Sequence, residues 1–135
     1  MVFRNLMKAA LFLMLCNPAF AKDCADASEV DLVGEWESHS YLEKKGYSQS
    51  TNVNRAIDGS FTIRFDIATD DGQQFSQTES GRWGYSNCLY SAVIEKIEGE
   101  QQKIQEVYYV KSIDAEQMTY ESVRSGQTYQ VSRVK

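Results

Sequence analysis

From residue 33 onward, apolar and polar residues alternate with a period of two. The clearest example follows Asp58-Gly59, where the apolar residues Phe61, Ile63, Phe65 and Ile67 alternate with polar ones. This repeat is typical of a β-strand, because successive side chains point to opposite faces. Turn residues separate eight such segments, and the pattern predicts eight strands: Val33–Leu42, Tyr47–Arg55, Phe61–Ile67, Gln73–Tyr85, Cys88–Ile97, Lys103–Ile113, Gln117–Val123 and Thr128–Val134.

The connections between these segments are short enough for hairpins. Asp58-Gly59 is a hairpin-type turn signal, and Ser80-Gly81 predicts a bulge or bend inside a long strand. Helical periodicity is nearly absent from this part of the chain. Only Ala25–Leu32 could form a helical turn or two, with Ser28 as N-cap.

Strands joined in sequence order by short turns form an antiparallel meander. An open meander leaves two exposed edges, and closing the sheet on itself removes them. Eight strands is the number that forms a small barrel. We therefore predict an all-β, eight-stranded antiparallel up-and-down barrel with a short N-terminal helical turn. An open sandwich is the alternative.

The first 21 residues differ from the rest and predict a secretory signal peptide. Arg4 and Lys8 give a positive start, and the apolar run Ala9–Leu15 is too short to span a bilayer. Ala19-Phe20-Ala21 then offers small residues at the positions that precede cleavage. The alternative is a buried N-terminal helix, but the segment lacks polar residues at helical spacing. We expect cleavage after Ala21 and a periplasmic or secreted protein.

The remaining 114 residues, Lys22–Lys135, are predicted to form a single domain. Without Arg4 and Lys8, the chain contains 12 Lys and Arg residues and 19 Asp and Glu residues, which gives a net charge of −7. Nucleic acid is excluded as a partner, because phosphate binding needs a basic face. Binding to an anionic lipid surface is disfavoured for the same reason. No membrane span is expected.

The cysteines agree with export. Cys16 lies within the predicted signal peptide, and Leu15 before it argues against a lipid anchor. Cys24 and Cys88 remain, and in an oxidising compartment we expect them to form a disulfide. Two free buried thiols are the alternative. With one histidine in the whole chain, His39, the ligands are too few for a structural zinc site.

Several short motifs resemble those of small bacterial lipocalin-like (calycin) domains. They are Gly34-Glu35-Trp36, Asp58-Gly59-Ser60-Phe61, Ser80-Gly81-Arg82-Trp83 and Tyr129-x-Val131-x-Arg133-Val134. The resemblance implies that Trp36, on the first strand, lies at the closed end of the barrel and that Arg133, on the last strand, packs across its ring. The chain is shorter than secreted animal lipocalins, so the interior is either a ligand cavity or filled with side chains.

The chain offers only weak candidates for a set of catalytic residues. His39 lies between Ser38 and Ser40, but adjacent strand residues point to opposite faces, so the strand presents neither serine to the ring. Glu35 and Glu37 share a face at about 7 Å, a spacing that glycosidases use. Two glutamates on a solvated strand are nonetheless commonplace. We therefore expect no enzymatic activity.

Metal and cofactor motifs are weak as well. Asp66, Asp70 and Asp71 precede Gly72, but their spacing does not follow the order of a calcium loop. A turn rich in Asp and Gly explains the cluster. The chain has no glycine-rich phosphate loop. We expect neither a metal nor a cofactor.

Aromatic residues carry the functional prediction, since all eight tyrosines fall after residue 21. Tyrosine suits both cavity walls and protein interfaces. We predict a binding barrel for a small apolar or amphipathic ligand, with these inward-facing residues in contact with it: Phe61, Ile63, Phe65, Trp83 and Tyr85.

The alternative is a protein-interaction module, such as a periplasmic inhibitor or accessory factor, with a filled interior and an outer aromatic patch near Tyr108 or Tyr109. Small exported bacterial barrels with one disulfide include inhibitors of lysozyme, a strongly basic enzyme that a protein of net charge −7 would attract.

Overall fold

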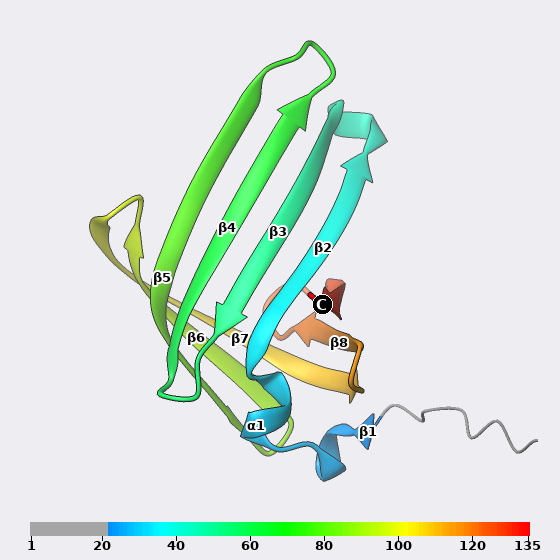
Figure 1. The fold of residues 1–135 in the computed structure, drawn as a ribbon, viewed down its shortest axis with the longest axis vertical. Coiled ribbons are helices and arrows are strands. Elements are labelled where there is room, and N and C mark those ends of the chain that lie inside the picture. Colours follow the sequence, from blue (N-terminus) through cyan, green and yellow to red (C-terminus); the bar gives the residue numbers. More distant parts are fainter. Residues whose placement is uncertain (1–21) are drawn as a thin grey trace, which may run out of the picture.

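Eight antiparallel strands follow one another around a closed barrel (Figure 1). The computed structural model describes residues 22–135, and the predicted signal peptide lies outside them. The strands are β2 (Gly34–Leu42), β3 (Tyr47–Arg55), β4 (Ser60–Thr69), β5 (Gln74–Ser86), β6 (Leu89–Ile97), β7 (Glu100–Ile113), β8 (Gln117–Ser122) and β9 (Thr128–Arg133). Each pairs with the next, and β9 pairs with β2 to close the circle. The predicted up-and-down barrel is confirmed.

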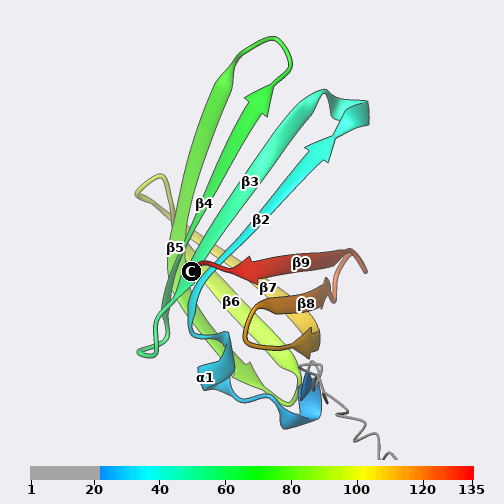
Figure 2. The ribbon, with the colours of Figure 1, turned by 45° about the vertical axis from the view of Figure 1, so that its right-hand side comes forward.

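A short N-terminal segment lies beside the end of the barrel at which β2 begins (Figure 2). It contains β1 (Lys22–Asp23), the 3₁₀ turn η1 (Cys24–Asp26) and the helix α1 (Glu29–Leu32). The backbone N–H of Ser28 donates to the Asp31 carboxylate at 2.8 Å, which satisfies a donor at the helix start. A second 3₁₀ turn, η2 (Glu43–Lys45), joins β2 to β3. No helix within residues 22–135 is long and apolar enough to cross a membrane.

The strands β2 to β5 extend well beyond the other four at one end of the barrel (Figure 2). There β2 leaves β9, because these strands pair only at Trp36 and Glu37. The pairing of β5 with β6 likewise begins only at Glu79. The barrel is therefore tightly closed near α1 and open toward the tips of β2 to β5, a difference that the sequence pattern did not predict.

The predicted irregularity at Ser80-Gly81 is confirmed as a shift of register between β5 and β6. A Cβ atom on Gly81 would lie 1.9 Å from the carbonyl oxygen of Val93. Only glycine permits this close approach of two backbones, and it lies at the bulge whose extra residue is Glu95 of β6.

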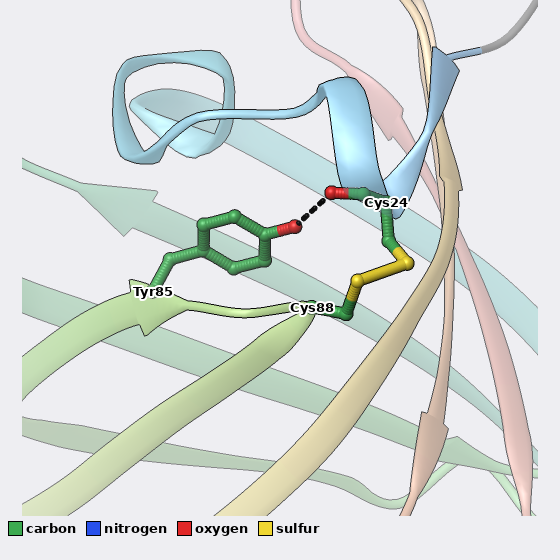
Figure 3. The surroundings of a disulfide bond; sticks show 3 residues. All are labelled: Cys24, Tyr85 and Cys88. Carbon is green, nitrogen blue, oxygen red and sulfur yellow. Dashed lines mark hydrogen bonds between the residues drawn. A yellow bond between two sulfur atoms is a disulfide. The ribbon is translucent and has the colours of Figure 1, made fainter.

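The predicted disulfide is also confirmed, and it joins Cys24 of η1 to Cys88 in the turn between β5 and β6 (Figure 3). The Tyr85 hydroxyl donates to the carbonyl oxygen of Cys24 at 2.8 Å and holds the same segment. Because the bond closes a separation of 64 residues, it stabilises the fold by about 3–4 kcal/mol in the chain-entropy description.

Candidate ligand-binding site in the barrel interior

Arg133 organises the closed end of the barrel. Its guanidinium carbon lies 4.1 Å from the centre of the fully buried Trp36 ring, the contact that the lipocalin-like resemblance implied. Its nitrogens donate to three backbone carbonyls, those of Ala115, Val33 and Asp31, at 2.7–2.9 Å. This cation over an indole face, with its donors satisfied, seals the base of the interior.

Gly34 makes room for this arrangement. A Cβ atom at this position would lie 2.7 Å from Nη1 of Arg133, and the backbone φ of +116° is unfavourable for other residues. The Gly-x-Trp motif and Arg133 therefore form one structural unit. Because Gly34 has no side chain, the guanidinium of Arg133 can lie against the backbone there and donate to the carbonyl oxygen of Val33.

Above this base the barrel contains a pocket of about 440 Å³. A second pocket of about 420 Å³ lies between β2 and β9, past the point at which these strands separate. The two pockets adjoin, since they share six lining residues: Ile63, Phe65, Tyr108, Tyr120, Gln127 and Tyr129. The interior is therefore hollow and accessible from the open end.

Four tyrosines, one from each of β6 to β9, form one wall of the pocket. Tyr90 stacks on Tyr108 with ring centres 5.4 Å apart, and Tyr120 stacks on Tyr129 at the same distance. Edge-to-face contact between Tyr108 and Tyr120 at 5.2 Å joins the two pairs. Such contacts hold the rings in fixed positions and leave a rigid aromatic wall.

Burial raises the pKa of two tyrosine hydroxyl groups in this wall and of one carboxyl group near it. Desolvation raises the pKa of the Tyr120 hydroxyl to about 12, although the nearby Arg55 charge and a hydrogen bond with Arg55 oppose the rise. Desolvation also raises the pKa of Tyr108. The same cause raises the pKa of Glu79, which lines the pocket from β5 and lies near Glu106. The raised pKa values keep the Tyr108 and Tyr120 hydroxyl groups neutral at ordinary pH.

Arg55, at the end of β3, also lines this pocket. Its side chain is 1% exposed, and its guanidinium carbon lies 4.5 Å from the centre of the Tyr90 ring. Among residues 22–135, its Nε and Nη1 atoms have no hydrogen-bond partner. Arg55 was not predicted as a site residue, although it lies two residues after Val53 on the same strand, so both side chains point to the inner face.

The five residues predicted to contact a ligand all lie on the inner face, but the structure places them in two groups. Phe61, Ile63 and Phe65 line the pocket. Trp83 and Tyr85 lie nearer the closed end, where both side chains hydrogen-bond to backbone. The Trp83 indole donates to the carbonyl oxygen of Ala56 at 3.0 Å, and Tyr85 binds Cys24 beside the disulfide (Figure 3).

The polar groups considered for chemistry lie on the outer face or at the tips. His39 is exposed and lies 3.9 Å from Glu37. Glu35 accepts a hydrogen bond from Asn52 at 2.7 Å. The three aspartates near the turn at Gly72 accept hydrogen bonds from separate partners: Asp66 from Arg64, Asp70 from Tyr41 and Asp71 from Thr69. In the described part of the chain, no group of three or more His, Cys, Asp or Glu side chains could hold a metal ion.

A larger hollow of about 630 Å³ lies where β2 to β5 extend beyond the barrel. Hydroxyl, amide and charged side chains dominate its lining, and none of the lining residues is buried. A ligand there would displace well-hydrated polar groups, and the large apolar side chains that it would cover, Tyr41 and Phe75, are themselves exposed. The interior pocket, with buried aromatic and aliphatic walls, is the better candidate site.

Comparison with known protein families and with curated protein sequences finds no match for this chain. The fold therefore defines its class: a closed, eight-stranded antiparallel up-and-down β-barrel with one short helix near its start, consistent with a calycin-like architecture.

Proposed function

We propose that this protein is an exported, non-catalytic, lipocalin-like barrel that binds a small apolar or amphipathic ligand in its interior. One observation carries the proposal: the barrel contains a pocket of about 440 Å³, lined by aromatic and aliphatic side chains together with polar and charged ones, and this pocket adjoins a second one between β2 and β9. A filled interior would have favoured the interaction module instead.

The size and lining of the pocket match what small-molecule sites require. Such sites range from about 300 to 1,000 Å³ and combine apolar walls with a few polar groups. Phe61, Ile63 and Phe65 provide the apolar surface on one side, and the tyrosine wall faces them. Burial of a ligand against these side chains contributes about 25 cal/mol per Å² of apolar surface before ordering costs.

Export and a periplasmic or secreted location belong to the same proposal. They rest on the charged start, short apolar run and small-residue site in residues 1–21. The Cys24–Cys88 disulfide supports them, because such bonds persist in oxidising compartments.

The interaction module remains the second candidate, and one surface feature favours it. Leu89 and Tyr109 are cross-strand neighbours on β6 and β7, and their side chains are 37% and 45% exposed. This pair is small compared with a protein interface, which typically takes 20–30 residues a side. The interior pocket therefore takes precedence.

A matched pair of variants on β4 tests the proposal. Ile63 lines the pocket, whereas its neighbour Thr62 is exposed on the outer face. Titration with the neutral dye Nile red, followed by fluorescence, should show saturable binding to the wild type. Ile63→Trp should weaken it at least about tenfold by filling the pocket, and Thr62→Trp should leave it unchanged. Absence of binding, or equal loss in both variants, would overturn the proposal.

A further inference from the structure

The wall of the barrel has a gap between its first and last long strands. β2 and β9 pair only at Trp36 and Glu37, and past this point the two strands separate (Figure 2). Within residues 22–135, no strand therefore pairs with residues 38–42 of β2 on the side that faces β9. Residues 128–131 of β9 likewise lack a partner strand on the side that faces β2.

The register identifies the backbone groups that face this gap. The N–H of Val134 donates to the carbonyl oxygen of Glu35 at 2.9 Å, just before the two paired residues of β2. In an antiparallel ladder, such hydrogen-bonded positions recur every two residues. The N–H and C=O groups of His39 and Tyr41 therefore point toward β9. A continued register would pair His39 with Gln130, but the strands have separated before they reach these residues.

Side chains beneath the gap offer apolar surface to a strand placed there. The pocket of about 420 Å³ lies at this gap, and Ile63, Phe65 and Tyr129 line it. No Lys, Arg, Asp or Glu side chain is part of that lining. Because side chains of a strand alternate between its two faces, every second side chain of an added strand would cover these apolar residues.

The edge of β2 lacks the features that usually prevent such pairing. Native edge strands are often protected by lysine, proline or a bulge. Residues 38–42 read Ser-His-Ser-Tyr-Leu, without Lys or Pro, and β2 pairs with β3 in unbroken register along this stretch. An unprotected edge beside an apolar pocket is the arrangement that binds an extended peptide by strand addition.

We propose that an extended segment of a partner protein adds a strand to the β2 edge at this gap, with apolar side chains facing the pocket and basic side chains facing outward. The inference goes beyond the proposed function, because backbone groups of β2 supply the hydrogen bonds and the partner is a polypeptide. The apolar side chains confer specificity through the pocket, and the backbone pairing confers affinity.

Charge on the outer face favours a basic partner segment. A partner residue opposite His39 would lie diagonally across from Glu37, whose side chain is 43% exposed. The next outward position lies beside the exposed ring of Tyr41, whose hydroxyl donates to the Asp70 carboxylate at 3.1 Å. The lysines of η2 lie past the end of β2. Residues 22–135 have a net charge of −7, which attracts a basic segment and disfavours a second copy of this chain.

A pair of fluorescein-labelled peptides tests the inference on the mature protein, residues 22–135. The first peptide, Lys-Val-Lys-Phe-Lys-Val-Lys, alternates basic and apolar residues. The second, Lys-Lys-Val-Phe-Val-Lys-Lys, has the same composition and charge without the alternation. Fluorescence anisotropy should show that the alternating peptide binds at least about tenfold more tightly, because only its apolar side chains share one face of a strand.

Two substitutions at one position test the backbone contact. His39→Pro removes an N–H that faces the gap but leaves the ladder with β3, since the alternate residues of β2, such as Leu42, bond toward β3. His39→Ala removes the same side chain and keeps the N–H. The proline variant should bind the alternating peptide at least about tenfold more weakly than the wild type, and the alanine variant should bind within about twofold.

Peptide N-methylation provides a second test that needs no variant protein. The outward basic residues of the peptide are the ones whose N–H groups would bond to β2. N-methylation of the two inner lysines should therefore abolish binding to the wild type, whereas N-methylation of the two valines should retain it. If His39→Pro does not fold in a thermal unfolding measurement, this pair decides: equal binding by the two methylated peptides overturns the inference.

The other outcomes are equally decisive. Absence of binding by the alternating peptide, equal binding by its rearranged counterpart, or unchanged binding by a folded His39→Pro variant overturns the inference. Sedimentation that shows a wild-type dimer, dissociated by His39→Pro, assigns the edge to a second copy and contradicts a basic partner. Nile red binding separates this inference from the proposed function: a protein that binds Nile red but not the peptide contradicts the strand addition alone.

Discussion

Two arginines lie against aromatic rings in this barrel: Arg55 is buried and Arg133 is half-buried, and they differ in their hydrogen-bond partners. Arg133, at the closed end, donates to the backbone carbonyl groups of Val33 and Asp31, which precede β2. Arg55, deeper in the interior, retains two nitrogens without partners among residues 22–135. At the scale of single residues, the two arginines therefore differ in hydrogen-bond satisfaction, because the interior one keeps only its contact with the Tyr90 ring and a hydrogen bond with Tyr120.

Replacement of Arg133 tests the structural role. Arg133→Ala should lower the free energy of unfolding by about 1–3 kcal/mol, because it removes packing on Trp36 together with three hydrogen bonds. Urea unfolding followed by tryptophan fluorescence measures this change. Arg64→Ala is the control: Arg64 is exposed and pairs only with nearby surface groups, so its loss should change stability by less than about 0.5 kcal/mol. Equal effects of the two substitutions would contradict the closed-end account.

Tyr120 predicts a loss of stability in alkali. Its pKa is about 12 in the folded barrel and 10.0 without burial, so the unfolded chain releases this proton first. Its contribution is therefore complete below pH 10 and is lost as pH rises through about 12, an effect on the order of 2 kcal/mol. Urea unfolding at several pH values should show a steeper alkaline decline for the wild type than for Tyr120→Phe. Identical declines would contradict the burial of this hydroxyl.

At the scale of elements, the register shift between β5 and β6, where Glu95 of β6 is the extra residue, lies close to the point at which the long strands leave the short ones. From Gly81 to Ser86, β5 pairs with β6 without interruption. On the N-terminal side of the shift, the pairing extends only to Glu79, and the rest of β5 has no partner in β6. The bulge lies where the chain passes from the closed barrel to the extension of β2 to β5. A close backbone approach between Gly81 and Val93 marks this register shift.

Two glycines of β5 provide a matched test of this contact. Gly81→Ala should destabilise the protein by about 2–4 kcal/mol, since the new Cβ would collide with the carbonyl of Val93 and the register shift would have to move. Gly84→Ala should be neutral or slightly stabilising, because nothing lies within 4 Å of its added Cβ. Thermal unfolding of both variants gives the comparison, and a neutral Gly81→Ala would show that the bulge is not required.

At the scale of the whole molecule, alternation and turn chemistry were sufficient to predict the eight strands, their order and the closure of the barrel. The two-residue strand β1 could not be predicted, because two residues carry no periodicity. The divergence of β2 from β9 also escaped prediction, since it depends on strand pairing between distant parts of the chain.

The candidate site was predictable in part, for a related reason. Phe61, Ile63 and Phe65 lie on the pocket wall because alternation assigns a face directly. Alternation alone could not tell that Trp83 and Tyr85 lie nearer the closed end. Arg55 was missed because a charged residue in a polar strand is usually solvated, and its burial depends on Tyr90 and Tyr120 from the opposite side of the barrel.

The processing of the chain is also testable on the exported protein. Expression of the full sequence in a bacterial host should yield a periplasmic protein that begins at Lys22, because the cleavage site follows Ala21. Intact mass measured before and after reduction and alkylation should show the loss of residues 1–21 and one disulfide. A mass that retains these residues would contradict the proposed export.

The measurement that tests the central claim most directly is the location of a bound ligand in solution. Two-dimensional ¹H–¹⁵N NMR spectra of the labelled protein, recorded during titration with octanoate, report which backbone amides sense the ligand. The account predicts saturable shifts concentrated on inner-face positions near the pocket, such as Val53, Ile63 and Tyr120, with little change at the outer pair Leu89 and Tyr109. Shifts confined to that outer pair, or no saturable shifts with octanoate or Nile red, would contradict an interior binding site.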